Sequence, residues 1–280
     1  MNRRAPVSRS PRELWLFATL WSLRQYPTKA REWSWEKKFA AIRDARFDGV
    51  FSPPIPEVAG RGDLRYLAVT SLTEKPKVEP ALKAAKALGA LAIDVQLGDF
   101  DSKLADMVSL AVCIRDVARD LELPYAIETH RDTFTETPEA TQALARGFRR
   151  ATRTSLPLCL DHSHFAVVRH LARDQLWERL KEPTELLEAA TQFHLRPFNG
   201  HHCQIPVRGR TGRRTPEYLD WLQYSGALLC HLRHEWAIAP VLAVPELGHA
   251  APAYGLSCFG DTWLDAQTVA HDLRRQWRTS

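Results

Sequence analysis

The chain has 280 residues, of which 45% are hydrophobic and 25% are charged, as in a globular protein with a large core. No apolar run approaches the roughly 20 residues needed to cross a membrane, which excludes a membrane-spanning protein. The net charge of +5 invites a nucleic-acid function, but the arginines gather at the chain ends and in one loop, which favours solvated segments. These are Arg3, Arg4, Arg9 and Arg12, then Arg208, Arg210, Arg213 and Arg214, and finally Arg274, Arg275 and Arg278.

The beginning of the chain and the cysteines indicate where the protein works. Residues 1–11 contain arginines but no apolar stretch, so we expect a disordered basic tail and not a signal peptide, followed by one domain over 12–280. The 5 cysteines form no CxxC pair. This usage predicts a reduced, cytoplasmic chain with buried thiols.

The first half of the chain alternates apolar runs with amphipathic segments. Ser34 is placed to cap a helix that carries Phe39, Ile42 and Ala45 at helical spacing. Residues 55–64 are irregular. Strands are predicted at 14–21, 50–52, 66–71 and 91–98, and further helices at 80–88 and 102–121.

The same alternation continues to the end of the chain. Thr137 and Pro138 open a helix as N-cap and first residue, and Thr215 with Pro216 repeat the pattern. Because parallel strands need helical crossovers, eight strand–helix repeats predict a single closed (β/α)8 TIM barrel. The later strands are expected to end at Glu128, His164, Arg196 and Glu246, and the later helices to cover 138–153, 166–180, the residues after 215, and 262–277.

Polar residues end each of the last four strands. Glu128, Asp161, His194 and Glu246 all follow short apolar runs, and strand ends form the functional face of such a barrel. A single residue of this kind is better explained as a polar residue that caps a strand end than as a metal ligand. Four on consecutive strands predict a site for one divalent ion such as Mn, Co, Mg or Zn. His164, three residues after Asp161, suits either a substrate contact, an N-cap or a partner of a ligand.

A histidine pair, His201 and His202, competes with His194 as the nitrogen ligand. The pair follows Asn199 and Gly200 in a loop, whereas His194 lies at a strand end. This placement favours His194.

Several short motifs resemble those of one known group. They are Glu128-Thr-His-Arg131, Asp161-His-Ser-His164, His194-Leu-Arg196, Gln204-Ile-Pro206 and Pro245-Glu246. In this order they resemble the ETHR, DLSH, HAR, QVP and PEFG motifs of uncharacterised members of the xylose isomerase-like TIM barrel superfamily. That superfamily contains the sugar phosphate isomerases and epimerases. The likeness covers residues 120–250 well and the first hundred weakly.

The resemblance implies a metal-dependent isomerase or epimerase of carbohydrate metabolism that acts on a sugar or sugar derivative through an enediolate. Glu128 and Glu246 would transfer the proton and also bind the metal, while Asp161 and His194 would mainly hold it. The residues expected to contact substrate are His130, Arg131, His164, Arg196 and His202.

The sequence also departs from the pattern. The epimerases carry an arginine a few residues after the histidine of the seventh strand, where this chain has Gly200. Arg196, Arg208 or Arg210 are the available substitutes. This departure leaves the substrate open.

Two rival functions share the same barrel. An endonuclease IV-like phosphodiesterase would need further histidines on early strands, which 66–71 and 91–98 lack. A non-catalytic sugar-binding barrel would not need all four ligand types. The sequence therefore predicts a small sugar-like partner, neither a membrane nor a nucleic acid, and leaves the oligomeric state open, a homo-oligomer included.

Overall fold

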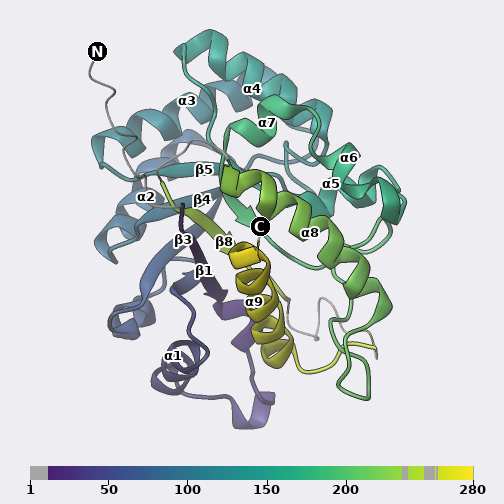
Figure 1. The fold of residues 1–280 in the computed structure, drawn as a ribbon. Helices are drawn as coiled ribbons and strands as arrows, with labels where there is room; N and C mark the ends of the chain where they lie inside the picture. The colour runs from purple at the N-terminus through teal and green to yellow at the C-terminus, as the bar shows by residue number, and fades with distance from the viewer. Residues whose placement is uncertain (1–11, 235–238, 249–255, 257, 280) are drawn as a thin grey trace, which may run out of the picture.

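The computed structural model describes residues 12–234, 239–248, 256 and 258–279. Eight parallel strands form a closed barrel in chain order, with the first strand paired to the last, and helices surround them (Figure 1). This arrangement confirms the predicted (β/α)8 TIM barrel. The strands are β1 Leu14–Thr19, β2 Gly49–Ser52, β3 Arg65–Leu72, β4 Ala92–Leu97, β5 Tyr125–Glu128, β6 Leu158–Leu160, β7 Ala190–His194 and β8 Val241–Val244.

Helices of very different lengths connect the strands. The α-helices are α1 Trp35–Asp44, α2 Val78–Ala87, α3 Leu104–Asp120, α4 Pro138–Thr152, α5 His162–Val168, α6 Leu176–Leu180, α7 Thr184–Glu188, α8 Pro216–His234 and α9 Thr262–Thr279. Short 3-10 helices are η1 Leu20–Leu23, η2 Lys29–Arg31, η3 Pro56–Arg61, η4 Lys75–Lys77 and η5 Arg173–Gln175. None of the helices in the described part is long and apolar enough to span a membrane.

The predicted helix starts are confirmed where capping residues gave them. The side chain of Ser34 accepts a hydrogen bond from the backbone N–H of Lys37, and that of Thr137 accepts one from Ala140. Each bond satisfies a backbone N–H that has no partner within its own helix.

Several strands end earlier than predicted, because local bonds turn the chain. β1 ends at Thr19, whose side chain accepts from the N–H of Trp21 and opens η1. β6 ends at Leu160 and not at His164, because Asp161 caps α5. β7 and β8 end at His194 and Val244, each shortly before a proline.

The single helix predicted over 166–180 is wrong. The chain there forms the end of α5, then η5 and α6 instead. The backbone of His170 is in the left-handed region (φ 48°), which ends α5 and lets the chain turn before η5. The polar composition of the segment did not reveal these breaks.

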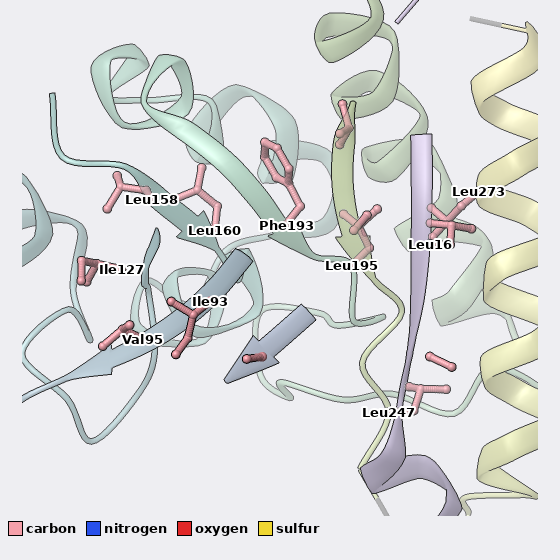
Figure 2. Close-up of a cluster of buried hydrophobic side chains, with 14 of the residues drawn as sticks. Leu16, Ile93, Val95, Ile127, Leu158, Leu160, Phe193, Leu195, Leu247 and Leu273 are labelled. Atoms are coloured by element: carbon pink, nitrogen blue, oxygen red, sulfur yellow. The ribbon is translucent and has the colours of Figure 1, made fainter. Parts of the chain in front are cut away.

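Most of the core lies between the strands and the surrounding helices. Figure 2 shows this layer, with Ile93 and Val95 of β4 and Phe193 of β7 pointing from the sheet toward the helices. A smaller apolar cluster fills the barrel interior, formed by Phe17, Phe51, Leu67, Ala92, Leu242 and Val244. Because side chains alternate along a strand, this division sets which residues face the barrel axis.

The remaining sequence-based expectations concern the ends and the thiols. All 5 cysteines lie in the described part and are free, with Cys159 and Cys203 buried and Cys230 and Cys258 exposed. The predicted tail over 1–11 lies outside the described residues.

Candidate metal centre

Strand alternation aims the predicted ligands at the barrel axis. Ile127, Leu160 and Phe193 pack outward against the helices, so the residues that follow each of them point inward. Glu128, Asp161 and His194 are these following residues. Since β5 to β7 are neighbours in the barrel, the inward side chains meet at one end of it.

Glu128, Asp161, His194 and Glu246, here called the quartet, form one compact cluster. One ligand atom from each lies within 4.8 Å of the others. Nδ1 of His194 lies 3.0 Å from Oε1 of Glu128 and 3.4 Å from Oε2 of Glu246. The structure thus brings together all four predicted ligands, whereas His201 and His202 do not belong to this cluster.

The quartet fits a divalent ion by its donors and their surroundings. Within the described residues, no hydrogen-bond donor is directed at either oxygen of Glu128, although that side chain is only 1% exposed. Buried polar atoms normally have a partner, so unsatisfied oxygens beside a histidine nitrogen suit a cation that collects them. Three carboxylates and one imidazole are a donor set for Mn, Co, Zn or Mg.

Asp94, which the sequence analysis did not select, orients the histidine. Its Oδ2 lies 3.3 Å from Nε2 of His194, on the other side of the ring from Glu128. A proton on Nε2, facing this carboxylate, leaves the lone pair of Nδ1 toward the quartet. Cys159 also lies in this deeper layer, and Asp94, Cys159 and His194 form a second group of ligand type. In the sequence, Asp94 could have been recognised because it is a carboxylate within a largely apolar strand.

Arg196 lies inside the quartet and not beside it. It is 2% exposed, and its Nη2 lies 2.9 Å from Oδ2 of Asp161. The same nitrogen contacts Oε2 of Glu246. A cationic side chain therefore already bridges two of the predicted ligands.

Charge interactions in the quartet oppose the effect of burial. Burial raises the pKa of Glu246, but the positive charges of Arg196 and His194 outweigh it and lower this pKa to about 2. The pKa of Asp161 is likewise held well below its usual range, against burial, by Arg196 and His164. Both groups are thus carboxylates at neutral pH.

The deeper layer behaves differently. Burial and the nearby charge of Glu128 raise the pKa of Asp94 to about 8. Burial lowers the pKa of His194, but Cys159, Glu128 and Glu246 outweigh it and raise this pKa well above its usual value. Both pKa values are thus shifted toward the protonated form, in a part of the barrel that lacks contact with bulk water.

Two further histidines line the approach to Asp161. Nε2 of His164 lies 3.4 Å from Oδ2 of Asp161, and the rings of His130 and His164 are 4.6 Å apart. Burial lowers the pKa of His130, so its imidazole is neutral at pH 7. Thr129 fixes the backbone of Asp161 by accepting from its N–H at 2.9 Å. These contacts place His130 and His164 where a molecule bound at the quartet would meet them.

The other predicted substrate residues lie farther out. Arg131 is exposed at the start of the loop after β5, and His202 is exposed, with Nδ1 3.1 Å from Oδ1 of Asn199. Arg208 is bonded to Asp265 through Nε at 2.7 Å. Of the three arginines considered as substitutes, only Arg196 contacts the quartet.

A cavity of about 530 Å³ opens beside the quartet, lined by His194 and Glu246 at one end. Its other walls come from β1 to β4, from η1 and α1, and from the loops after η1 and β2, and include Trp21, Trp35 and Gln96. This size and mixed lining are typical of sites for small molecules. The sequence analysis missed these walls, because no motif in the first hundred residues marks them.

Gly200, which stands where the resemblance leads us to expect an arginine, has no room for a side chain. A Cβ at this position would lie 2.0 Å from the carbonyl oxygen of Leu171 and 2.7 Å from its nitrogen. Side-chain atoms cannot approach backbone so closely, so this loop excludes any larger residue.

Comparison with known proteins identifies the fold. No protein-family profile and no curated protein matches the chain. An L-ribulose 3-epimerase superposes with a TM-score of 0.61 at 12% identity, covering 95% of both chains. The D-allulose 3-epimerase from Methylomonas sp. in complex with D-allulose gives 0.59 at 15% identity, covering 96% of this chain and 98% of that one. Endonuclease IV from Thermus thermophilus gives 0.52 at 12% identity, covering 96% of this chain and 100% of that one.

These similarities define the class of protein by its fold. The molecule is a (β/α)8 barrel whose last four strands end in a candidate divalent-metal centre. It shares its fold with these two epimerases and with endonuclease IV. At identities of 12–15%, the likeness concerns the fold.

Proposed function

We propose that the protein is a divalent-metal-dependent isomerase or epimerase of a sugar or sugar derivative. The observation that carries this proposal is the quartet, in which two glutamates, one aspartate and one histidine converge within 4.8 Å beside a cavity of about 530 Å³. The epimerases of the same fold support it. A barrel that binds sugar without catalysis would not need two buried glutamates whose carboxylate oxygens lie within 4.8 Å of each other.

Glu128, Asp161, His194 and Glu246 would hold the ion. When bound, a divalent ion polarises a carbonyl and an adjacent hydroxyl and so acidifies the carbon-bound proton between them. The remaining chemistry belongs to the side chains. One of Glu128 and Glu246, as the carboxylate, would remove that proton to give an enediolate and would itself become protonated. The other, which must carry a proton once the substrate is bound, would return it to the second face or the neighbouring carbon, so the two glutamates exchange protonation states in each turnover.

The surrounding residues orient the substrate and keep water out. His130, His164 and Arg196 offer donors to substrate oxygens, with the neutral imidazole of His130 able to donate or accept. Trp21 and Trp35 give the cavity apolar walls of the kind that pack against sugar rings. Burial of the quartet strengthens every electrostatic interaction in it.

The decisive experiment combines metal analysis with a panel of keto and aldo sugars in deuterated water. We expect about one ion per chain, and solvent deuterium in the product carbon. Glu128→Gln and Glu246→Gln keep the size and one acceptor oxygen but cannot carry a proton. Each should lower kcat by on the order of a thousandfold, about 4 kcal/mol, in protein whose metal content has been measured.

Three results would contradict parts of this proposal. Near-normal turnover in either metal-loaded glutamine variant would exclude the two-glutamate mechanism. Products without solvent deuterium would favour a hydride shift. Cleavage of abasic-site DNA with no sugar conversion would favour the endonuclease IV-like alternative, which shares the fold.

A further inference from the structure

Arg196 contacts the oxygens that a metal ion would use. Asp161 accepts a hydrogen bond from the N–H of Ser163 through Oδ1 at 2.9 Å, so Oδ2 is its outward-facing ligand atom. It is Oδ2 that lies 2.9 Å from Nη2 of Arg196. In Glu246 the contacted atom is Oε2, the oxygen that also lies 3.4 Å from Nδ1 of His194. The guanidinium therefore takes one ligand oxygen from each of two quartet members.

The position of Arg196 in the chain directs its side chain toward the quartet. It follows His194 by two residues, and alternation points both side chains to the barrel axis. Arg196 is 2% exposed, so no bulk solvent separates it from the carboxylates. In such surroundings a fixed positive charge stabilises the carboxylates strongly and repels a second cation strongly.

We propose that Arg196 is a built-in competitor of the divalent ion, which must displace its guanidinium from Asp161 or Glu246 in order to bind. The inference rests on the proposed metal centre. It adds that the chain compensates its buried carboxylates without an ion and thereby sets a weaker metal affinity than the quartet alone would give. Arg196 acts here on the metal site, in addition to any contact with substrate.

The test measures metal affinity and thermal stability, not turnover. Purified protein is stripped with a chelator and titrated with Mn²⁺ and Co²⁺ by calorimetry, and Tm is recorded with and without the metal. In Arg196→Met we expect at least tenfold tighter binding than in the wild type. Its Tm without metal should be lower, and its rise in Tm on adding metal should be larger.

Arg214→Met is the matched control. Arg214 forms a two-point pair with the buried Asp272, at 2.8 and 2.7 Å, outside the quartet. This variant should also lower Tm, but its metal affinity should equal that of the wild type. The comparison separates competition for ligands from loss of an arginine–carboxylate pair.

Arg196→Lys distinguishes contact from charge and serves if Arg196→Met does not fold. Lysine keeps the charge but lacks the planar fork, so we expect binding at least threefold tighter than in the wild type. If the wild type binds metal and Arg196→Met binds it no more tightly, the competition by Arg196 is overturned while the metal centre stands. If Arg196→Met does not fold, the same result in Arg196→Lys has the same meaning. Failure of the wild type and of both variants to bind either metal would instead overturn the proposed metal centre itself.

Discussion

The imidazole of His194 is held between two acidic layers. Glu128 and Glu246 face Nδ1, while Asp94 faces Nε2 from deeper in the barrel. A carboxylate behind a histidine ligand fixes the tautomer and raises its basicity, and removing such a partner typically costs about 10–100-fold in metal affinity. In the proposed metal centre, Asp94 would thus act through His194 and not as a ligand.

This role leads to a prediction for Asp94→Leu, which keeps the branched shape of the side chain but removes the acceptor. We expect Mn²⁺ binding, followed by calorimetry, to weaken about 10–100-fold. Cys159→Ser is the control, because Cys159 belongs to the deeper group but not to the quartet. If Cys159→Ser weakened binding as much as Asp94→Leu, the ion would sit in the deeper group and the quartet would be the wrong site.

At the level of elements, the loops after β7 and β8 are tied to each other beside the quartet. Gln204 accepts from the N–H of Gly248 at 2.7 Å and donates to its carbonyl at 3.4 Å. Ile205 donates from its backbone to Pro197 at 3.0 Å, which closes the first loop on itself. The Gln204-Ile-Pro206 motif therefore has a structural role: it holds the chain that follows His194 and Glu246.

The loop after β7 also packs against the turn after α5, where Gly200 lies next to Leu171. Gly200→Ala would place its Cβ 2.0 Å from the Leu171 oxygen, and backbone atoms cannot move aside cheaply. We expect a loss of about 1–3 kcal/mol or more in the free energy of unfolding, measured by urea denaturation. Gly209→Ala is the control, since nothing lies within 4 Å of its Cβ position. Equal stability of the two variants would mean that the loop is not packed as described.

At the scale of the whole molecule, three of the arginines of the basic segments are paired with aspartates. Arg208, Arg214 and Arg274 contact Asp265, Asp272 and Asp48, respectively. These pairs join the loop between β7 and α8 to α9, and α9 to the turn before β2. The arginines thus contribute to closing the barrel, where they are not available to a phosphate backbone.

We therefore expect only weak binding to single- or double-stranded DNA in an electrophoretic shift assay. The binding should fall steeply with salt, because exposed arginines act through counterion release alone. The deletion of residues 1–11 is a useful comparison, as it removes Arg3, Arg4 and Arg9. Tight binding that persists at moderate salt, or cleavage at abasic sites, would contradict this expectation.

The sequence by itself determined the barrel and the four residues of the quartet. An apolar run that ends in Glu128 or His194 encodes both a buried strand and its polar tip within a few residues. Likewise Ser34 and Thr137 mark helix starts through bonds to residues three positions away. Such features can be recognised without knowledge of the fold, because the residues that interact are close in the chain.

Only the tertiary structure decided what surrounds the quartet. Arg196 meets Asp161 and Glu246, and Asp94 meets His194, across separations of 35 to 100 residues. These contacts depend on how neighbouring strands are staggered around the barrel, which fixes the depth of each inward side chain. The exclusion of a side chain at Gly200 by Leu171 has the same origin, since two loops that are distant in sequence touch only after the barrel has closed.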